Sequence, residues 1–221
     1  FDLDILRQVI SLSFFFENLT KNQLENDFTC IIGDGFGSLT SLMLASNFSR
    51  KVLLVNLTKT LLVDLWYIKL WMGEKKFNES VILIDNINDL NKHNTQEILN
   101  SNKIRLIAIE AKNHNLIRSF KIDFFVNIVS MQEMNNESID NYFNDIRKSL
   151  KEKNLYFYCC NRLVKKLPDG TITNFNKYPW RNEDKYLVNE LCPWHNYFYQ
   201  KLPPFYKKYD GPVQHRLVRL R

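Results

Sequence analysis

Three closely spaced glycines make one short segment of this sequence well suited to binding a ligand. They lie in Cys30-Ile31-Ile32-Gly33-Asp34-Gly35-Phe36-Gly37-Ser38, between a strand-like apolar run and a helical pattern. Glycine tolerates positive φ angles and has no Cβ to obstruct a ligand, and the following helix offers free backbone N–H donors. The alternative is a tight turn that binds nothing. The residues expected to contact a cofactor here are Gly33, Asp34, Gly35 and Gly37.

The spacing of these glycines distinguishes two kinds of cofactor loop. It reads G-x-G-x-G, and Ser38 stands where the dinucleotide fingerprint G-x-G-x-x-G has its third glycine. A loop of the methyltransferase type therefore fits better than a pyrophosphate-binding loop. Ile31 departs from that type, because methyltransferases usually carry an acid two residues before the first glycine.

Asn56 occupies the place, about 20 residues past the glycines, where a doubly wound fold presents a group to the cofactor ribose. Its amide can donate hydrogen bonds to hydroxyls and accept them, but it lacks the charge of the more common carboxylate. The alternative is an asparagine that only ends a strand at a turn. We expect Asn56 to contact the cofactor.

Apolar runs alternate with helical patterns in a βαβα order, which is typical of a parallel sheet with helices on its faces. The expected buried strands are Phe28–Ile32, Val52–Val55, Ile104–Ile109, Phe124–Val129 and Leu155–Cys160, with Val81–Ile84 as an extra edge strand and Val213–Leu220 as a last strand. The expected helices are Ser38–Ser46, Thr58–Met72 with Thr58 as N-cap and Gly73 as its stop, and a third carrying Ile139, Tyr142, Phe143, Ile146 and Leu150. The fold class is α/β, a Rossmann-like, doubly wound, mostly parallel sheet.

The 221 residues fit one domain with a small appendage. We expect residues 1–27 to form a helical lead-in that is trimmed at its start, because the chain opens with Phe1 and shows no leader. Residues 28–221 then form the main domain. Within it, residues 162–212 are rich in proline and aromatic residues, and we expect them to form a substrate-facing extension.

Composition narrows the classes of function. The net charge is +6, but the basic residues are dispersed, which argues against a nucleic-acid partner. No apolar run approaches the roughly 20 residues of a membrane-spanning helix. The four cysteines lack paired C-x-x-C spacing, and no H-x-x-x-H or clustered carboxylates appear, so we expect no metal. A reducing, cytoplasmic compartment follows.

A series of short motifs resembles the family of sugar O-methyltransferases. The first is Phe124-Phe125-Val126-Asn127-Ile128-Val129-Ser130-Met131-Gln132-Glu133-Met134-Asn135. It is followed in order by Tyr158-Cys159-Cys160-Asn161-Arg162, Leu167-Pro168-Asp169-Gly170-Thr171, Tyr178-Pro179-Trp180, Glu190-Leu191-Cys192-Pro193-Trp194-His195, and Pro203-Pro204-Phe205-Tyr206 running on to Val218. Together they cover nearly the whole chain from Phe28.

The resemblance implies a class I methyltransferase fold with S-adenosylmethionine as cofactor, and a methyl transfer to a hydroxyl of a sugar or sugar nucleotide in polysaccharide biosynthesis. Besides the glycine loop and Asn56, it places Asn127 and Ser130 at the cofactor. A base within hydrogen-bond reach assists such a transfer, and His and Glu suit that role near neutral pH. The candidates for the catalytic base are His195 and Glu133.

The candidate base Glu133 lies just past a strand's carboxyl end, where ligands bind in open α/β sheets. The alternative interpretation of Glu133 is a carboxylate that stabilises the start of a helix. The alternative interpretation of His195 is a buried or surface histidine with no catalytic role. Side chains expected to bind the sugar are Asn161, Arg162, Trp180 and Trp194, the aromatic pair by stacking. Ordinary core packing and a surface arginine are the alternatives.

Two other classes of function remain open. One is a binding domain that kept the fold and lost catalysis, which Ile31 and Asn56 favour because each replaces an expected acid. The other is a nicotinamide-dependent sugar enzyme, which the missing third glycine disfavours.

Overall fold

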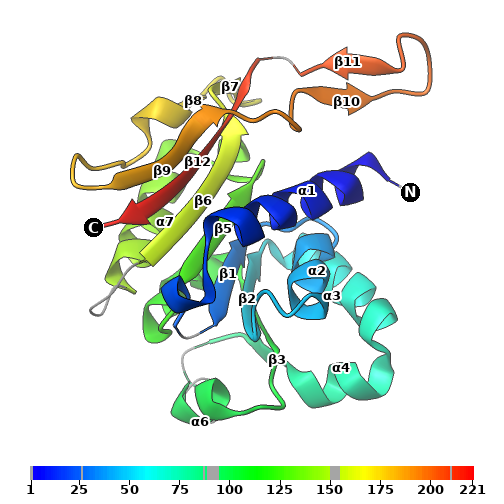
Figure 1. Ribbon diagram of the computed structural model, residues 1–221, viewed down its shortest axis with the longest axis vertical. Coiled ribbons are helices and arrows are strands. Elements are labelled where there is room, and N and C mark those ends of the chain that lie inside the picture. Colours follow the sequence, from blue (N-terminus) through cyan, green and yellow to red (C-terminus); the bar gives the residue numbers. More distant parts are fainter. Residues whose placement is uncertain (1, 26, 87, 89–94, 150–154, 210) are drawn as a thin grey trace.

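A single eight-stranded sheet organises the protein (Figure 1). The computed structural model describes residues 2–25, 27–86, 88, 95–149, 155–209 and 211–221. The strands of the sheet are β1 (Phe28–Ile32), β2 (Lys51–Asn56), β3 (Val81–Ile84), β4 (Leu106–Glu110), β5 (Phe124–Ile128), β6 (Leu155–Arg162), β9 (Lys185–Leu191) and β12 (Val213–Leu220). Their order is β3-β4-β2-β1-β5-β6-β12-β9. The pairings from β3 to β6 are parallel, whereas β12 runs antiparallel to both of its neighbours.

Helices cover both faces of the sheet, as expected of a doubly wound fold. The α-helices are α1 (Leu3–Asn18), α2 (Ser38–Ala45), α3 (Thr58–Met72), α4 (Glu74–Ser80), α6 (Thr95–Asn100) and α7 (Asn136–Lys148). The short 3₁₀ segments are η1 (Lys21–Gln23), η2 (Ala111–Ser119), η3 (Met131–Glu133) and η4 (Phe175–Lys177). Helices α1 and α2 lie on one face and α7 on the other (Figure 1). None of the described helices is long and apolar enough to span a membrane.

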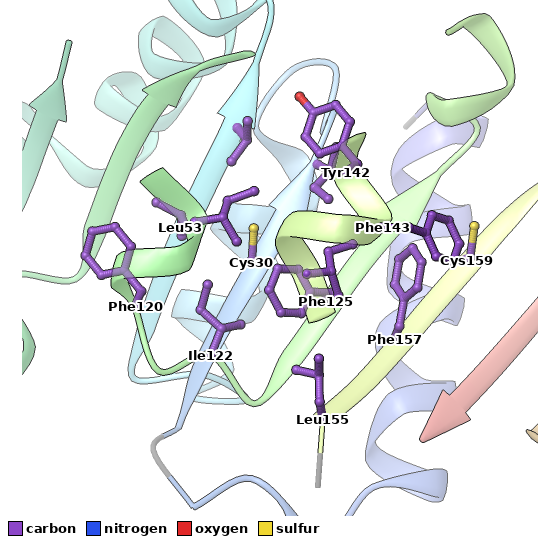
Figure 2. Close-up of a cluster of buried hydrophobic side chains, with 14 of the residues drawn as sticks. Cys30, Leu53, Phe120, Ile122, Phe125, Tyr142, Phe143, Leu155, Phe157 and Cys159 are labelled. Atoms are coloured by element: carbon purple, nitrogen blue, oxygen red, sulfur yellow. The ribbon is translucent and has the colours of Figure 1, made fainter. Parts of the chain in front are cut away.

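The sheet separates two apolar cores because its strands are buried on both faces. On the α7 face, Cys30, Phe125, Phe143 and Cys159 belong to one buried cluster, as Figure 2 shows. On the α1 face, Phe15 packs edge-on against Phe124 and Tyr158, with ring centroids 5.0 and 4.8 Å away. Successive side chains of a strand point to opposite faces.

The expected strands are confirmed with small shifts of their ends. β4 begins at Leu106 rather than Ile104, and β6 extends to Arg162. The expectation that Thr58 caps α3 is wrong: Thr58 is the first helical residue, and Leu57 is the N-cap with no side-chain hydrogen bond. Gly73 ends this helix with φ of 79°, as predicted. Leu150, the end of the predicted apolar stripe, lies outside the described residues.

The proline-rich segment adds two antiparallel hairpins beyond the main sheet. They pair β7 (Val164–Lys166) with β8 (Ile172–Asn174), and β10 (Tyr197–Tyr199) with β11 (Tyr206–Lys208). The β10–β11 hairpin projects away from the sheet near the start of α1 (Figure 1). It carries exposed aromatic side chains, including Tyr199 and Tyr206.

A buried ion pair ties the proline-rich segment to helix α7. Arg147 on α7 donates to both carboxylate oxygens of Asp184, over 3.0 and 2.7 Å, and neither side chain is exposed. Asp184 also accepts from the backbone amides of Arg181 and Arg221, so it fixes the end of the chain. Burial alone would raise the pKa of Asp184, but these hydrogen bonds, led by that from Arg147, hold it below its usual value.

Asp184→Asn should lower the free energy of unfolding by about 3 kcal/mol or more, because it leaves the buried Arg147 charge uncompensated. Urea denaturation measures this, with the exposed Asp140→Asn of α7 as a control that should change little. Since the pKa of Asp184 is depressed in the folded state, the stabilisation is present at neutral pH and is lost as the pH falls below about 4. An equal loss in both variants would contradict this role.

Candidate functional site

A pocket of about 800 Å³ opens where β1, β2, β4 and β5 end. That volume suits a small molecule or cofactor, and the carboxyl ends of parallel strands are where ligands bind in such sheets. The lining residues are Ile32, Gly33, Asp34, Gly35, Val55, Asn56, Leu57, Thr60, Ala111, Lys112, His114, Ile128, Val129, Ser130, Glu133, Met134, Asn135, Ser138 and Tyr142. The expected residues Gly33, Asp34, Gly35, Asn56, Ser130 and Glu133 are among them.

The three glycines of the loop have different surroundings, although each has a positive φ of 66 to 81°. A Cβ on Gly33 would lie 2.3 Å from Ser130 Oγ, and one on Gly37 would lie 2.7 Å from Ile68 and 2.8 Å from the Asp64 carbonyl. A Cβ on Gly35 would meet nothing within 4 Å. Gly33 and Gly37 therefore permit close packing, whereas Gly35 borders open space in the pocket.

Asp34 caps the helix that follows the loop. Its carboxylate accepts hydrogen bonds from the backbone amides of Leu39 and Thr40, over 3.0 and 2.7 Å. The expectation that this helix offers those donors to a ligand is therefore wrong, because an internal carboxylate already occupies them. Burial raises the pKa of Asp34, and its hydrogen bonds to Thr40 and Leu39 oppose that shift.

A second acid, Asp64 on α3, joins the loop to the end of β2. Its carboxylate accepts from the Phe36 amide and from Asn56 Nδ2, each over 2.7 Å. Asn56 Oδ1 in turn accepts from the Leu57 amide at 2.9 Å. Burial, with the nearby charge of Asp34, raises the pKa of Asp64 to about 6. Asn56 thus lines the pocket in an orientation fixed by Asp64.

Asn127 forms a buried polar network between the ends of three strands. Its Nδ2 donates to the Ile32 carbonyl at 2.8 Å and contacts Ser130 Oγ at 2.5 Å. Its Oδ1 accepts from the Met131 amide and from Asn161 Nδ2, over 3.1 and 2.9 Å. Asn127 and Asn161 are fully buried and outside the pocket lining, so of this network only Ser130 borders the pocket.

The two candidate bases lie in different environments. Glu133 lines the pocket on η3, is half exposed, and pairs with Lys165 Nζ at 3.2 Å. His195 is 3% exposed and lies outside that lining. Burial, followed by the charges of Arg7 and His215, lowers the pKa of His195 to about 3, so its imidazole is neutral.

The remaining expected sugar-binding residues also lie outside the pocket lining. Trp180 packs edge-on against Phe143 at 4.9 Å, and its indole N–H donates to the Phe175 carbonyl at 2.9 Å. Arg162 places its guanidinium 5.3 Å from the centre of the Tyr209 ring. Trp194 borders a smaller hollow of about 380 Å³ together with Leu3, Arg7, Tyr197 and Tyr206.

His114 is a pocket residue that sequence reasoning missed. Its Nδ1 contacts the carboxylate of Asp145, a fully buried side chain that also accepts from Arg118 Nε at 2.5 Å. Burial alone would raise the pKa of Asp145, but the hydrogen bonds from His114 and Arg118 hold it below its usual value. The contact with Asp145 thereby orients the imidazole. Its position four residues past β4 was the available signal.

Comparisons with known proteins establish the fold. No model of a protein family matches the sequence, and no curated protein matches it. Among solved structures, the methyltransferase domain of bacterial CtHen1-CN is 11% identical, with a TM-score of 0.51, over 99% of this chain and 100% of that one. M. capricolum TrmK in complex with S-adenosyl-homocysteine is 9% identical, over 92% of this chain and 70% of that one, with a TM-score of 0.48.

The chain therefore has the Rossmann-like fold of class I methyltransferases. One departure from their usual pattern has a physical explanation. Ile31 is 1% exposed within the apolar core of the α1 face, where a carboxylate would be buried among hydrocarbon side chains. The carboxylates at this loop are instead those of Asp34, within the loop, and Asp64, on α3. Asp34 accepts from the Leu39 amide and Asp64 accepts from the Phe36 amide.

Gly37→Ala should destabilise the protein more than Gly35→Ala. Both changes place a side chain at positive φ, at about 1–2 kcal/mol, but only Gly37→Ala also overlaps Ile68 and Asp64, adding about 1–3 kcal/mol. Urea denaturation of the two variants gives the difference. Equal free energies of unfolding would show that Gly37 is not a packing glycine.

Proposed function

We propose that this protein is an S-adenosylmethionine-dependent methyltransferase that acts on a hydroxyl of a sugar or sugar nucleotide. One observation carries the proposal: the glycine loop leaves open space at Gly35, beside the carboxylate of Asp34, within a pocket of cofactor size. The methyltransferase fold supports it.

The residues of the pocket fit the parts of this cofactor. The glycine loop offers backbone and the carboxylate of Asp34, which suit the cationic amino-acid and sulfonium groups. Asn56 is held at the end of β2, where its amide can bind the ribose hydroxyls. His114 and Tyr142 present flat rings on which the adenine of the cofactor can stack. When bound, the cofactor supplies a methyl group on a positively charged sulfur.

Asp34 also argues against the nicotinamide alternative. A dinucleotide places its pyrophosphate on the amides at a helix N-terminus. In this chain the Leu39 and Thr40 amides are taken by Asp34, whose negative charge would repel phosphates. The chemistry of the loop therefore favours a cationic ligand that has no phosphate.

Glu133 is our candidate for the base that takes the proton of the acceptor hydroxyl. It lines the pocket, and its half-exposed carboxylate can be reached by an acceptor entering from solvent. The pairing with Lys165 Nζ orients the carboxylate. A proton taken by Glu133 leaves the acceptor oxygen more nucleophilic, and holding that oxygen in line with the methyl group supplies much of the remaining acceleration.

The proposal of a sugar acceptor rests on the family resemblance and on exposed aromatic rings. Tyr197, Tyr199 and Tyr206 of the β10–β11 hairpin are exposed, as is Phe205 between its strands. Such rings stack on the apolar face of a pyranose, and a tyrosine adds a polar edge. A cytoplasmic location belongs to the same proposal, because all four cysteines are unpaired, as in reducing compartments.

Calorimetric titration should show S-adenosylmethionine and S-adenosylhomocysteine binding in the micromolar range, about −8 kcal/mol. Gly35→Val should abolish binding, because its side chain would enter the pocket. Gly170→Val is the matched control: Gly170 also has a positive φ and open space around it, but it lies outside the pocket lining. Failure of the unmodified chain to bind would favour the catalytically silent alternative.

Glu133→Gln should lower kcat for methyl transfer about 10²- to 10⁴-fold, because the amide cannot accept the hydroxyl proton. Affinity for S-adenosylhomocysteine should stay unchanged. The measurement is turnover with a panel of sugars and sugar nucleotides, and Glu137→Gln, exposed in the first turn of α7, is the control. Unaltered kcat in the Glu133 variant would remove it from the reaction.

A further inference from the structure

Three potential metal ligands meet on the α1 side of the sheet, away from the residues that line the cofactor pocket. Cys160 comes from β6, and Cys192 and His195 come from the turn after β9. The two sulfur atoms and an imidazole nitrogen all lie within 4.8 Å of one another. All three residues are buried. The topology thus brings Cys160 together with two residues that lie more than thirty positions later in the sequence.

His195 is the informative member of the cluster. Both of its ring nitrogens are buried without a hydrogen-bond partner among the described residues. A buried polar atom without a partner is costly and is unusual in native proteins. A metal ion bound at one nitrogen would satisfy that nitrogen.

Cys192 stands at the start of the turn after β9. Its backbone amide donates to the Val213 carbonyl at 2.9 Å, which fixes this end of the turn to the start of β12. The spacing Cys192-Pro193-Trp194-His195 also lets one short turn supply two ligands.

We propose that Cys160, Cys192 and His195 bind a zinc ion. Two thiolates and one imidazole form a soft donor set that suits zinc, and three protein ligands leave a fourth position for water. Two thiol protons leave as the two zinc–sulfur bonds form, so the charges of the ion and the thiolates cancel in this buried place. The sequence predicted no metal because no ligand-spacing motif is present, and Cys160 lies too far from Cys192 in the sequence to form one.

The site would join three separate parts of the chain. Trp194, between two of the ligands, donates its indole N–H to Ser11 Oγ at 3.0 Å, and its carbonyl accepts from Arg7 Nε at 3.2 Å. Zinc would therefore fix the turn after β9 both to β6 and, through Trp194, to helix α1. This role is structural and does not depend on the proposed methyl transfer.

The first test is the metal content of the untagged protein, expressed with added zinc and purified without chelators. Elemental analysis should give about one zinc per chain. Cobalt reconstitution of the stripped protein should give a thiolate-to-cobalt charge-transfer band, and added zinc should raise its melting temperature. Less than about a tenth of an equivalent of zinc, with no cobalt spectrum, would overturn the proposal.

Single substitutions localise the site. Cys192→Ser and His195→Gln should each weaken zinc binding more than about 100-fold in competition with a chromophoric chelator, since even residues that only support ligands contribute 10- to 100-fold. Cys159→Ser is the matched control: Cys159 adjoins Cys160 but points into the opposite core (Figure 2), so zinc should be retained.

Thiol labelling followed by mass spectrometry tests the site in the unsubstituted chain, so it remains informative if the variants fail to fold. Zinc should protect Cys160 and Cys192 from alkylation, and a chelator should remove that protection. A disulfide between these two cysteines in protein purified under reducing conditions would overturn the proposal. Equal alkylation of both with and without zinc would also do so.

Discussion

The capture of the glycine loop by two carboxylates is the interaction on which the site depends. Asp34 holds the first turn of α2, and Asp64 holds the Phe36 amide between two glycines. Four residues of the loop have positive φ, namely Gly33, Gly35, Phe36 and Gly37. The hydrogen bonds to the two carboxylates stabilise this unusual backbone conformation. That conformation in turn sets the open space at Gly35 and the orientation of Asn56.

The same carboxylates decide what kind of ligand the loop can take. An open helix N-terminus attracts anions, but here the protein has placed its own anion there. Burial raises the pKa of both acids, to about 6 for Asp64, because removing a carboxylate from water disfavours its charged form. A cation at this position would relieve that cost. The two carboxylates therefore favour a cation over an anion at the loop, and this argument does not depend on the resemblance to a methyltransferase family.

Sequence patterns predicted the sheet well because its strands are buried on both faces and read as continuous apolar runs, as Phe28–Ile32 does. They predicted the pocket residues near the glycines for a related reason: position along a parallel strand fixes which edge a residue reaches. They did not reveal His114, since its role depends on Asp145 from a distant helix. Nor could they show that Asn127 and Asn161 hydrogen-bond to each other, because orientation depends on packing across strands.

The aromatic residues after β6 also show that position in the sequence does not determine how a side chain is oriented. They divide into rings that complete the core, such as Trp180 against Phe143, and rings that remain exposed, such as Tyr206. Amino-acid composition does not distinguish the buried rings from the exposed ones. The difference between the two groups of rings depends on strand pairing. β12 pairs with β9 and so keeps that strand in the main sheet, whereas β10 and β11 pair with each other and project away from it (Figure 1). An acceptor that stacks on exposed rings would therefore meet those of the hairpin.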